Sequence, residues 1–252
     1  MITSPGNARI KDIVKLQTSA AERNARGLFV VEGRKLVSEA PKEALREIYV
    51  TEDYIARYGA DFPCPVETVT EEVFRKISDT RSPQGILAVA AQRQDTFESL
   101  LSKGPVLVLQ TIQDPGNLGT MLRTGEGAGI GGILTDRDTV DRYNPKVIRS
   151  TMGSIYRVPL FAAEDLPAAI QRLKQEGYAL YAAHLKGRSS YTDISYPEKT
   201  AFLVGNEGNG LSDEIADLAD TYIRIPMEGQ VESLNAAVSA VLLAYEWHRQ
   251  RL

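Results

Sequence analysis

The sequence has little capacity to bind a metal or form a disulfide. It contains one cysteine, Cys64, and two histidines, His184 and His248. One thiol cannot form an internal disulfide or a cysteine-based zinc site, and two imidazoles are too few for a histidine-based centre. The sequence also lacks an apolar run of the roughly 18 residues that a membrane span needs, and its start, MITSPGNARIKDIVKLQ, lacks the apolar segment of a secretion signal. We therefore expect a cytoplasmic protein with no metal and no membrane partner.

Positive charge is also scarce. The chain holds 29 Lys and Arg against 33 Asp and Glu, a net charge of −4, which argues weakly against a nucleic-acid-binding protein. The charge is uneven, however, because residues 1–46 carry nine basic residues and five acidic ones. A basic N-terminal face on an acidic body can contact phosphates. A solvated helix surface explains the same charges equally well.

The first part of the chain has the pattern of a small α/β domain. Hydrophobic residues make up 43% of the 252 residues and charged residues 25%, as in ordinary globular proteins. Apolar spacing predicts helices over 8–17 and 70–79 and a helix that starts at 34. Predicted strands cover 27–33, 46–53, 65–70 and 85–92. The polar segment 96–104 is predicted to link this domain, residues 1–95, to a second domain over 105–252.

A second α/β series begins at residue 105. Continuous apolar strands such as VLVLQ and AFLVG indicate a parallel sheet that is buried on both faces. The expected strands are 105–112, 131–135, 156–161, 178–185, 200–207 and 220–227, and the expected helices are 117–128, 144–154, 165–177, 211–219 and 233–250. The segment GAGIGG (127–132) matches G-x-G-x-x-G, but it follows a helix and precedes a strand. That order is the reverse of a dinucleotide site, so we interpret it as a helix C-cap and turn.

Three loops at the ends of predicted strands carry polar residues. The first leads into Asn117 and Arg123, the second is the glycine-rich loop 205–210, and the third runs from Ile225 to Asn235. Glycine-rich loops between a strand and a helix often bind phosphate, but Glu207 disfavours an anion and suits a cation. Taken singly, each loop is also explained as a surface turn, with Asn117 or Ser233 as a helix cap.

Together, the order and spacing of these loops are more specific. N-x-G-x-x-x-R (117–123), G-N-E-G-x-G (205–210) and I-P-M…E-S-L-N (225–235) resemble the three motifs of the SpoU (TrmH-type) family of RNA ribose 2′-O-methyltransferases in the SPOUT class. The resemblance covers about residues 105–250. RNARGLFVVEGRKLVSEA and TRSPQGILAVA resemble, less specifically, the N-terminal substrate-binding domain of some members, which is related to a small ribosomal-protein fold.

The resemblance implies a parallel sheet with helices and a deep trefoil knot, S-adenosylmethionine in the knot loops, RNA as substrate, and a homodimer through the knotted domain. It implies these cofactor-binding residues: Gly205, Gly210, Ile225, Met227 and Leu234. It implies these catalytic residues: Asn117, Arg123, Glu207, Ser233 and Asn235. An arginine is effectively always protonated. We therefore expect Arg123 to position an RNA phosphate and stabilise the developing alkoxide, with Glu207 as its ion-pair partner.

The two-domain layout favours ribosomal RNA over transfer RNA as the substrate. The alternative is a non-catalytic RNA-binding or ribosome-assembly protein, which the presence of Arg123, Glu207 and Asn235 disfavours. Further candidates for an RNA path, which a solvated helix face explains at least as well, are Tyr143, Asn144, Lys146, Arg149 and Arg157.

Overall fold

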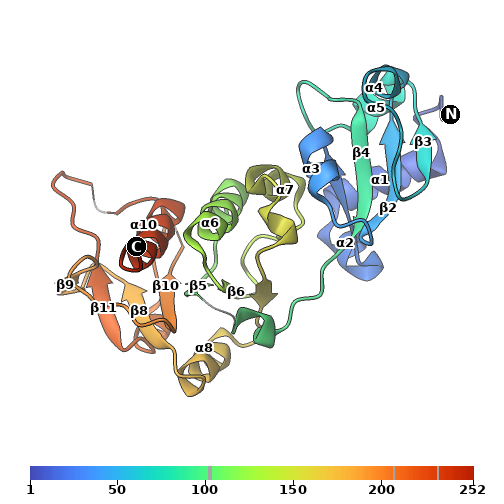
Figure 1. Ribbon diagram of the computed structural model, residues 1–252. Coiled ribbons are helices and arrows are strands. Elements are labelled where there is room, and N and C mark those ends of the chain that lie inside the picture. Colours follow the sequence, from blue (N-terminus) through green and yellow to red (C-terminus); the bar gives the residue numbers. More distant parts are fainter. Residues whose placement is uncertain (102–103, 207, 232) are drawn as a thin grey trace. The chain divides into compact units, whose positions relative to one another are not determined.

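The computed structural model describes residues 1–101, 104–206, 208–231 and 233–252, and it divides into two compact units (Figure 1). The first unit contains Met1–Gln94 together with Asp141–Tyr156. The second contains Asp95–Val140 and Arg157–Leu252. Segment 141–156 therefore lies within the predicted second domain in sequence but packs with the first unit.

The first unit is built on a four-stranded sheet in the order β1-β4-β2-β3. Its elements are α1 (Ala8–Thr18), α2 (Ala20–Arg26), β1 (Leu28–Glu32), α3 (Arg34–Glu39), β2 (Leu45–Val50), α4 (Glu52–Tyr58), β3 (Val66–Thr68), α5 (Glu71–Ile77), β4 (Ile86–Ala91), α7 (Pro145–Thr151) and the 3₁₀ turn η2 (Ser154–Tyr156). Strand β4 pairs antiparallel with β1 and β2, and β2 pairs parallel with β3. The mixed α/β layer expected from the sequence is confirmed.

The two faces of β1 pack against different parts of the chain. Val30 belongs to the core cluster that includes Ile13 of α1 and Phe74 of α5. The neighbouring Phe29 points the other way, because side chains alternate along a strand. Its ring lies 4.5 Å from that of Tyr143 and 6.5 Å from that of Tyr156, measured between centroids. Segment 141–156 thus covers the face of the sheet opposite α1 and α5.

A buried ion pair holds segment 141–156 to the first unit. The Arg23 side chain is only 4% exposed, and its guanidinium lies 2.6 Å from an Asp141 carboxylate oxygen. Arg23 also donates to the carbonyl oxygens of Leu16 and Gln17. Removing one partner of such a pair leaves a buried charge uncompensated, so this contact fixes where the segment attaches.

The second unit contains a seven-stranded sheet in the order β7-β6-β5-β10-β8-β11-β9, in which every paired neighbour is parallel. Its elements are the 3₁₀ turn η1 (Phe97–Leu100), β5 (Val106–Leu109), α6 (Pro115–Ala128), β6 (Gly132–Thr135), β7 (Leu160–Ala162), α8 (Leu166–Gln175), β8 (Ala179–Ala183), β9 (Ser189–Ser190), β10 (Thr200–Val204), α9 (Asp213–Ala216), β11 (Thr221–Arg224) and α10 (Ala236–Arg249). All described residues of β5 and β10 are buried, as the continuous apolar runs predict.

Helices cover both faces of this sheet (Figure 1). Val106 and Val108 of β5 share a core cluster with Ile170 and Leu173 of α8 and with residues of α9. The alternate β5 residues are also fully buried and face the other side, where α10 contacts both α6 and β10. Phe97 and Leu100 of η1, which lie inside the predicted linker, belong to the same cluster as Val106 and Val108.

Several boundaries differ from those expected. The strand predicted over 46–53 ends at Val50, because Thr51 caps α4 by accepting a hydrogen bond from the Tyr54 amide. The strand predicted over 156–161 is wrong at its start, because Tyr156 lies in η2 and donates its hydroxyl to the Leu36 carbonyl within the first unit. None of the described helices combines the length and the apolar character that crossing a bilayer requires.

Candidate active site

The glycine-rich loop after β10 folds back on itself. The amides of Asn206 and Gly210 each donate to the other residue's carbonyl, at 3.2 and 2.9 Å. Gly205 is required here, because a Cβ at this position would lie about 2.0 Å from the Gly210 carbonyl carbon. At Gly205 and Gly210 backbone therefore approaches backbone more closely than any side chain would permit.

The side chain of Asn206 organises this loop, although sequence reasoning did not select it. Its Oδ1 accepts hydrogen bonds from the amides of Gly208 and Asn209 at 2.7 and 3.3 Å, and its Nδ2 donates to the Thr111 carbonyl at 2.8 Å. Two of the amides that could bind a phosphate are therefore already engaged. This agrees with the expectation that the loop does not bind phosphate, and an Asn within a glycine-rich turn is the pattern that could have revealed it.

A cavity of about 270 Å³ lies between this loop, the ends of β8, β10 and β11, and the segment that leads into α10. Ligands in parallel α/β sheets bind at the carboxyl ends of the strands, which is where this cavity lies. All five predicted cofactor-binding residues line it, and among the predicted catalytic residues that the structure describes Ser233 does so too: Gly205, Gly210, Ile225, Met227, Leu234 and Ser233. Residues from two of the three motif loops thus line one cavity, with an apolar side and a side formed by the glycine-rich backbone.

Two further residues of the cavity come from strand ends that the motifs do not include. His184 follows β8, and Arg224 ends β11. The His184 Nδ1 accepts a hydrogen bond from the Lys186 amide at 3.1 Å, so its proton in the neutral form is on Nε2. The imidazole ring lies 5.1 Å from the Tyr222 ring. A histidine and an arginine at neighbouring strand ends therefore offer hydrogen-bond donors to a ligand.

An exposed ion pair lies beside the segment that contains His184. The Lys186 ammonium lies 2.9 Å from an Asp213 carboxylate oxygen. That hydrogen bond raises the pKa of Lys186 and lowers the pKa of Asp213. Because both side chains are exposed, the pair adds little stability and serves mainly to connect this segment to α9.

The structure brings Asn117 and Asn235 together from elements that are far apart in the sequence. The Asn235 Nδ2 donates to the Asn117 Oδ1 at 3.1 Å. The Asn235 Oδ1 accepts from the amides of Ala237 and Val238 and so caps α10. The idea that Ser233 caps this helix is therefore wrong, and Asp114 rather than Asn117 caps α6. The Asn117–Asn235 contact therefore joins the first turn of α6 to the start of α10.

Arg123 does not lie with this pair. It is exposed on α6, six residues after Asn117, and makes no ion pair with any residue that the structure describes. Six residues of helix correspond to an offset of about 120° around the axis and about 9 Å along it. Arg123 is also not among the residues that line the cavity. Glu207, its predicted partner, lies outside the described residues.

The candidate RNA path over 143–157 is largely explained by structural contacts. Tyr143 is buried beside Phe29, and Asn144 caps α7. Arg149 pairs with Asp79, and Arg157 pairs with Glu126. Tyr143 is therefore not available to RNA. The arginines are partly neutralised by their carboxylate partners.

The comparisons with known proteins agree over both units. Residues 104–245 match the model of the SpoU rRNA Methylase family, and residues 7–88 match the MRM3-like substrate binding domain. The 23S rRNA (guanosine(2553)-2′-O)-methyltransferase RlmP of Bacillus subtilis (strain 168) is 36% identical over 248 residues, which is 97% of each chain.

Solved structures are similar over nearly the whole chain. An AdoMet-bound rRNA methyltransferase from Sinorhizobium meliloti aligns with a TM-score of 0.88 and 29% identity, over 100% of this chain and 98% of its own. An RNA 2′-O ribose methyltransferase aligns with a TM-score of 0.82 and 32% identity, over 99% of this chain and 98% of its own. Each of these two solved chains is therefore similar to this protein over both of its units.

Proposed function

We propose that this chain, which belongs to the SpoU rRNA methylase family, has ribosomal RNA as its substrate. It is an RNA ribose 2′-O-methyltransferase that uses S-adenosylmethionine. We also propose that the cavity beside the glycine-rich loop holds the cofactor. One observation carries the assignment of the cavity. The five residues that the family motifs designate as cofactor-binding come from separate loops and line the same cavity.

The cavity fits S-adenosylmethionine in its chemistry. Leu234 and Ile225 provide an apolar surface for the adenosine, and the backbone at Gly205 and Gly210 lines the same cavity without side chains that would fill it. Donors on His184 and Arg224 suit the carboxylate of the methionine portion. When bound, the cofactor supplies an electrophilic methyl group on a sulfonium, a cationic centre that a phosphate-binding loop would not favour.

The protein's part in the reaction is to position a ribose hydroxyl and polarise it while its proton passes to solvent water, because a neutral hydroxyl is a poor nucleophile. We assign the orientation of the ribose to Asn117, Asn235 and Ser233. We propose that Arg123 contacts an RNA phosphate and stabilises the developing alkoxide. Its distance from Asn117 along α6 favours the phosphate contact. The assignment of Glu207 as the partner of Arg123 rests on the sequence motif.

The contact between Asn117 and Asn235 can be tested apart from helix capping. Asn235→Ala removes both and is expected to lower the melting temperature by about 2–4 °C, for a cap worth about 1 kcal/mol. Asn235→Asp keeps the acceptor that caps α10 but places a carboxylate oxygen against the Asn117 Oδ1. It is expected to melt close to the wild type and to methylate RNA more slowly. Wild-type methylation by Asn235→Asp would remove the positioning role.

We assign RNA binding to residues 1–95, catalysis to 105–252 and the connection between them to 96–104. The basic N-terminal segment and the match to a substrate binding domain support the first assignment. Deleting residues 1–95 is a poor test of it, because Phe29 and Arg23 are packing partners of segment 141–156. Single substitutions on the surface of the first unit avoid that damage.

We also propose that the chain forms a homodimer through the second unit and that its C-terminal segment is knotted, as the family resemblance implies. Val238 and Tyr245 of α10 are 47% and 44% exposed, which is high for apolar and aromatic side chains on a helix that is otherwise well buried. Such side chains suit an interface between two copies. A cytoplasmic location likewise stays a prediction.

The function is tested by incubating the purified protein with labelled S-adenosylmethionine and transcripts of ribosomal or transfer RNA. Transfer to a ribose 2′-oxygen of ribosomal RNA, found by nuclease digestion and mass spectrometry, is the expected result. Labelling of transfer RNA alone would overturn the proposed substrate, and cofactor binding without any transfer would favour the non-catalytic alternative. Light scattering on the same sample gives the mass, and an active monomer would contradict the proposed dimer.

A further inference from the structure

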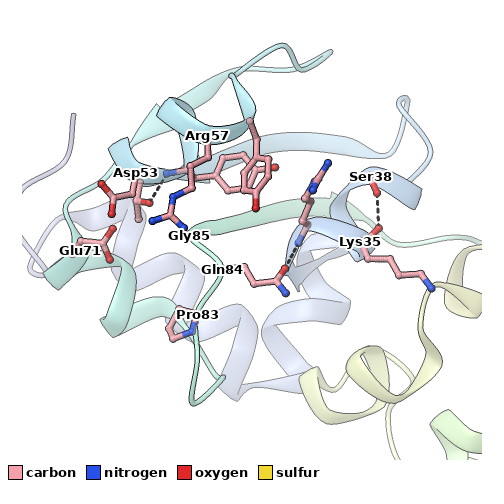
Figure 2. Close-up of a pocket in the computed structure, with 12 residues that line it drawn as sticks. Lys35, Ser38, Asp53, Arg57, Glu71, Pro83, Gln84 and Gly85 are labelled. Carbon is pink, nitrogen blue, oxygen red and sulfur yellow. Dashed lines mark hydrogen bonds between the residues drawn. The ribbon is translucent and has the colours of Figure 1, made fainter.

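The first unit contains a cavity of about 810 Å³ that is distinct from the cofactor cavity (Figure 2). It lies between α3, α4 and the segment before β4, and we call it the α3–α4 groove. The residues that matter for its chemistry are Arg34, Lys35, Arg57, Tyr54, Tyr58 and Gln84. Three cations and two aromatic rings in one recess are the side chains that bind unpaired nucleotides in proteins.

The aromatic part of the groove is held in place before any ligand binds. Tyr58 is 54% exposed, yet its ring centroid lies 4.3 Å from the Arg34 guanidinium carbon and 5.0 Å from the Tyr54 ring. Tyr54 itself is buried, so it anchors this stack to the core. A flat, immobilised surface loses little conformational entropy when a base stacks on it.

The backbone around Arg34 is also fixed. The Gln84 Oε1 accepts a hydrogen bond from the Arg34 amide at 2.8 Å, which leaves the Gln84 Nε2 as a donor (Figure 2). Gly85 has a φ of +74°, and a Cβ there would lie 2.6 Å from the Thr51 Oγ1. The segment before β4 therefore meets α3 through the side-chain amide of Gln84. It meets the start of α4 at Gly85, where a side chain would not fit.

Charge in the groove is divided between its two ends. Asp53 and Glu71 lie on the same side as Arg57, away from Lys35 and Gln84 (Figure 2). Lys35 has one weak ion pair, to Glu39 at 3.8 Å. Neither Arg34 nor Arg57 forms an ion pair with a residue in the described part of the chain. The end at Arg34 and Lys35 is therefore the positive one, where a phosphate would bind.

We propose that the α3–α4 groove binds one unpaired nucleotide of the substrate RNA, with its base stacked on Tyr58 and its phosphate at Arg34 and Lys35. This inference rests on the proposed function, because it names the part of the RNA that the first unit recognises. A paired base is stacked between its neighbours and cannot offer its face to Tyr58. The groove thus selects single-stranded loops or bulges over duplex.

The test measures binding of fluorescent RNA to the full-length protein by anisotropy, with a mixed-sequence single strand and a duplex of the same length as probes. Tyr58→Leu is expected to weaken single-strand binding by about tenfold or more, since stacking contributes about 1–3 kcal/mol per base. Tyr58→Phe keeps the ring and is expected to retain binding. Duplex binding is expected to be the same in both variants.

A second measurement tests the phosphate end. Arg34→Gln is expected to reduce the salt dependence of log affinity for the single strand by about 0.7, the change for one phosphate contact. Lys42→Gln removes one positive charge from an exposed residue of the same unit outside the groove, and serves as the matched control. A 4-thiouridine single strand irradiated in the near ultraviolet is expected to crosslink to the peptide that contains Tyr58.

The outcomes separate this inference from the function on which it rests. Equal single-strand binding by Tyr58→Leu and Tyr58→Phe, or crosslinks that avoid α4, would reject the groove while the wild type still methylates RNA. A wild-type protein that neither binds the cofactor nor methylates RNA would reject the proposed function instead. Each variant is checked for wild-type S-adenosylmethionine affinity, so a general folding defect is recognised.

Discussion

The Leu234→Arg variant is expected to lose S-adenosylmethionine binding, with the dissociation constant raised by about a hundredfold or more. Leu234 lines the cavity that we assign to the cofactor and is half-buried. A guanidinium in its place fills the space for the adenosine and brings a positive charge toward the sulfonium. Two like charges about 4 Å apart repel by roughly 4 kcal/mol in surroundings of intermediate dielectric. Isothermal titration calorimetry of both proteins measures the difference directly.

The control for this variant is Leu234→Met, which keeps an apolar side chain of similar volume. It is expected to bind the cofactor within a few-fold of the wild type, because such swaps usually cost less than about 1.5 kcal/mol. Thermal unfolding of all three proteins shows whether the arginine has damaged the fold. A well-folded Leu234→Arg protein that binds normally would place the cofactor elsewhere and remove the main support for the assigned cavity.

The elements predicted best from the sequence are those with a strong local pattern. The apolar spacing at Ile10, Ile13 and Leu16 predicted α1, and the continuous apolar run of β5 predicted a strand buried on both faces. Helix α2 was missed because its seven residues, AAERNAR, include only one buried side chain, that of Arg23. Its position depends on the distant Asp141, which local periodicity cannot reveal.

The sequence predicted some residues of the site and missed others, for a similar reason. The motifs placed Gly205, Ile225 and Leu234 together because their order and spacing matched a family, and the structure shows all three lining one cavity. His184 and Arg224 were missed because they join the cavity through the pairing of β8 with β11, a register that the sequence does not display. By contrast, the different directions of Asn117 and Arg123 follow from six residues of helix and could have been calculated.

Arg123→Ala is expected to reduce kcat/KM for methyl transfer by about a hundredfold or more and to leave S-adenosylmethionine affinity unchanged. Losing one preorganised donor to developing negative charge has an effect of about that size. Arg123 does not line the cavity that we assign to the cofactor, so calorimetry is expected to report wild-type binding. Arg123→Lys keeps the charge without the planar fork and is expected to recover part of the activity. A loss of cofactor affinity equal to the loss of kcat/KM would exclude the assigned role.

The same assay tests Glu207 as the partner of Arg123. Glu207→Gln is expected to lower turnover far more than cofactor affinity, because a neutral amide no longer orients the guanidinium through charge. If the two side chains act as a pair, the double variant is expected to be little worse than Arg123→Ala alone, since residues in one interaction are not additive. Fully additive losses would show that Arg123 and Glu207 act separately, and Glu207 would then be free to serve the sulfonium or the ribose proton instead.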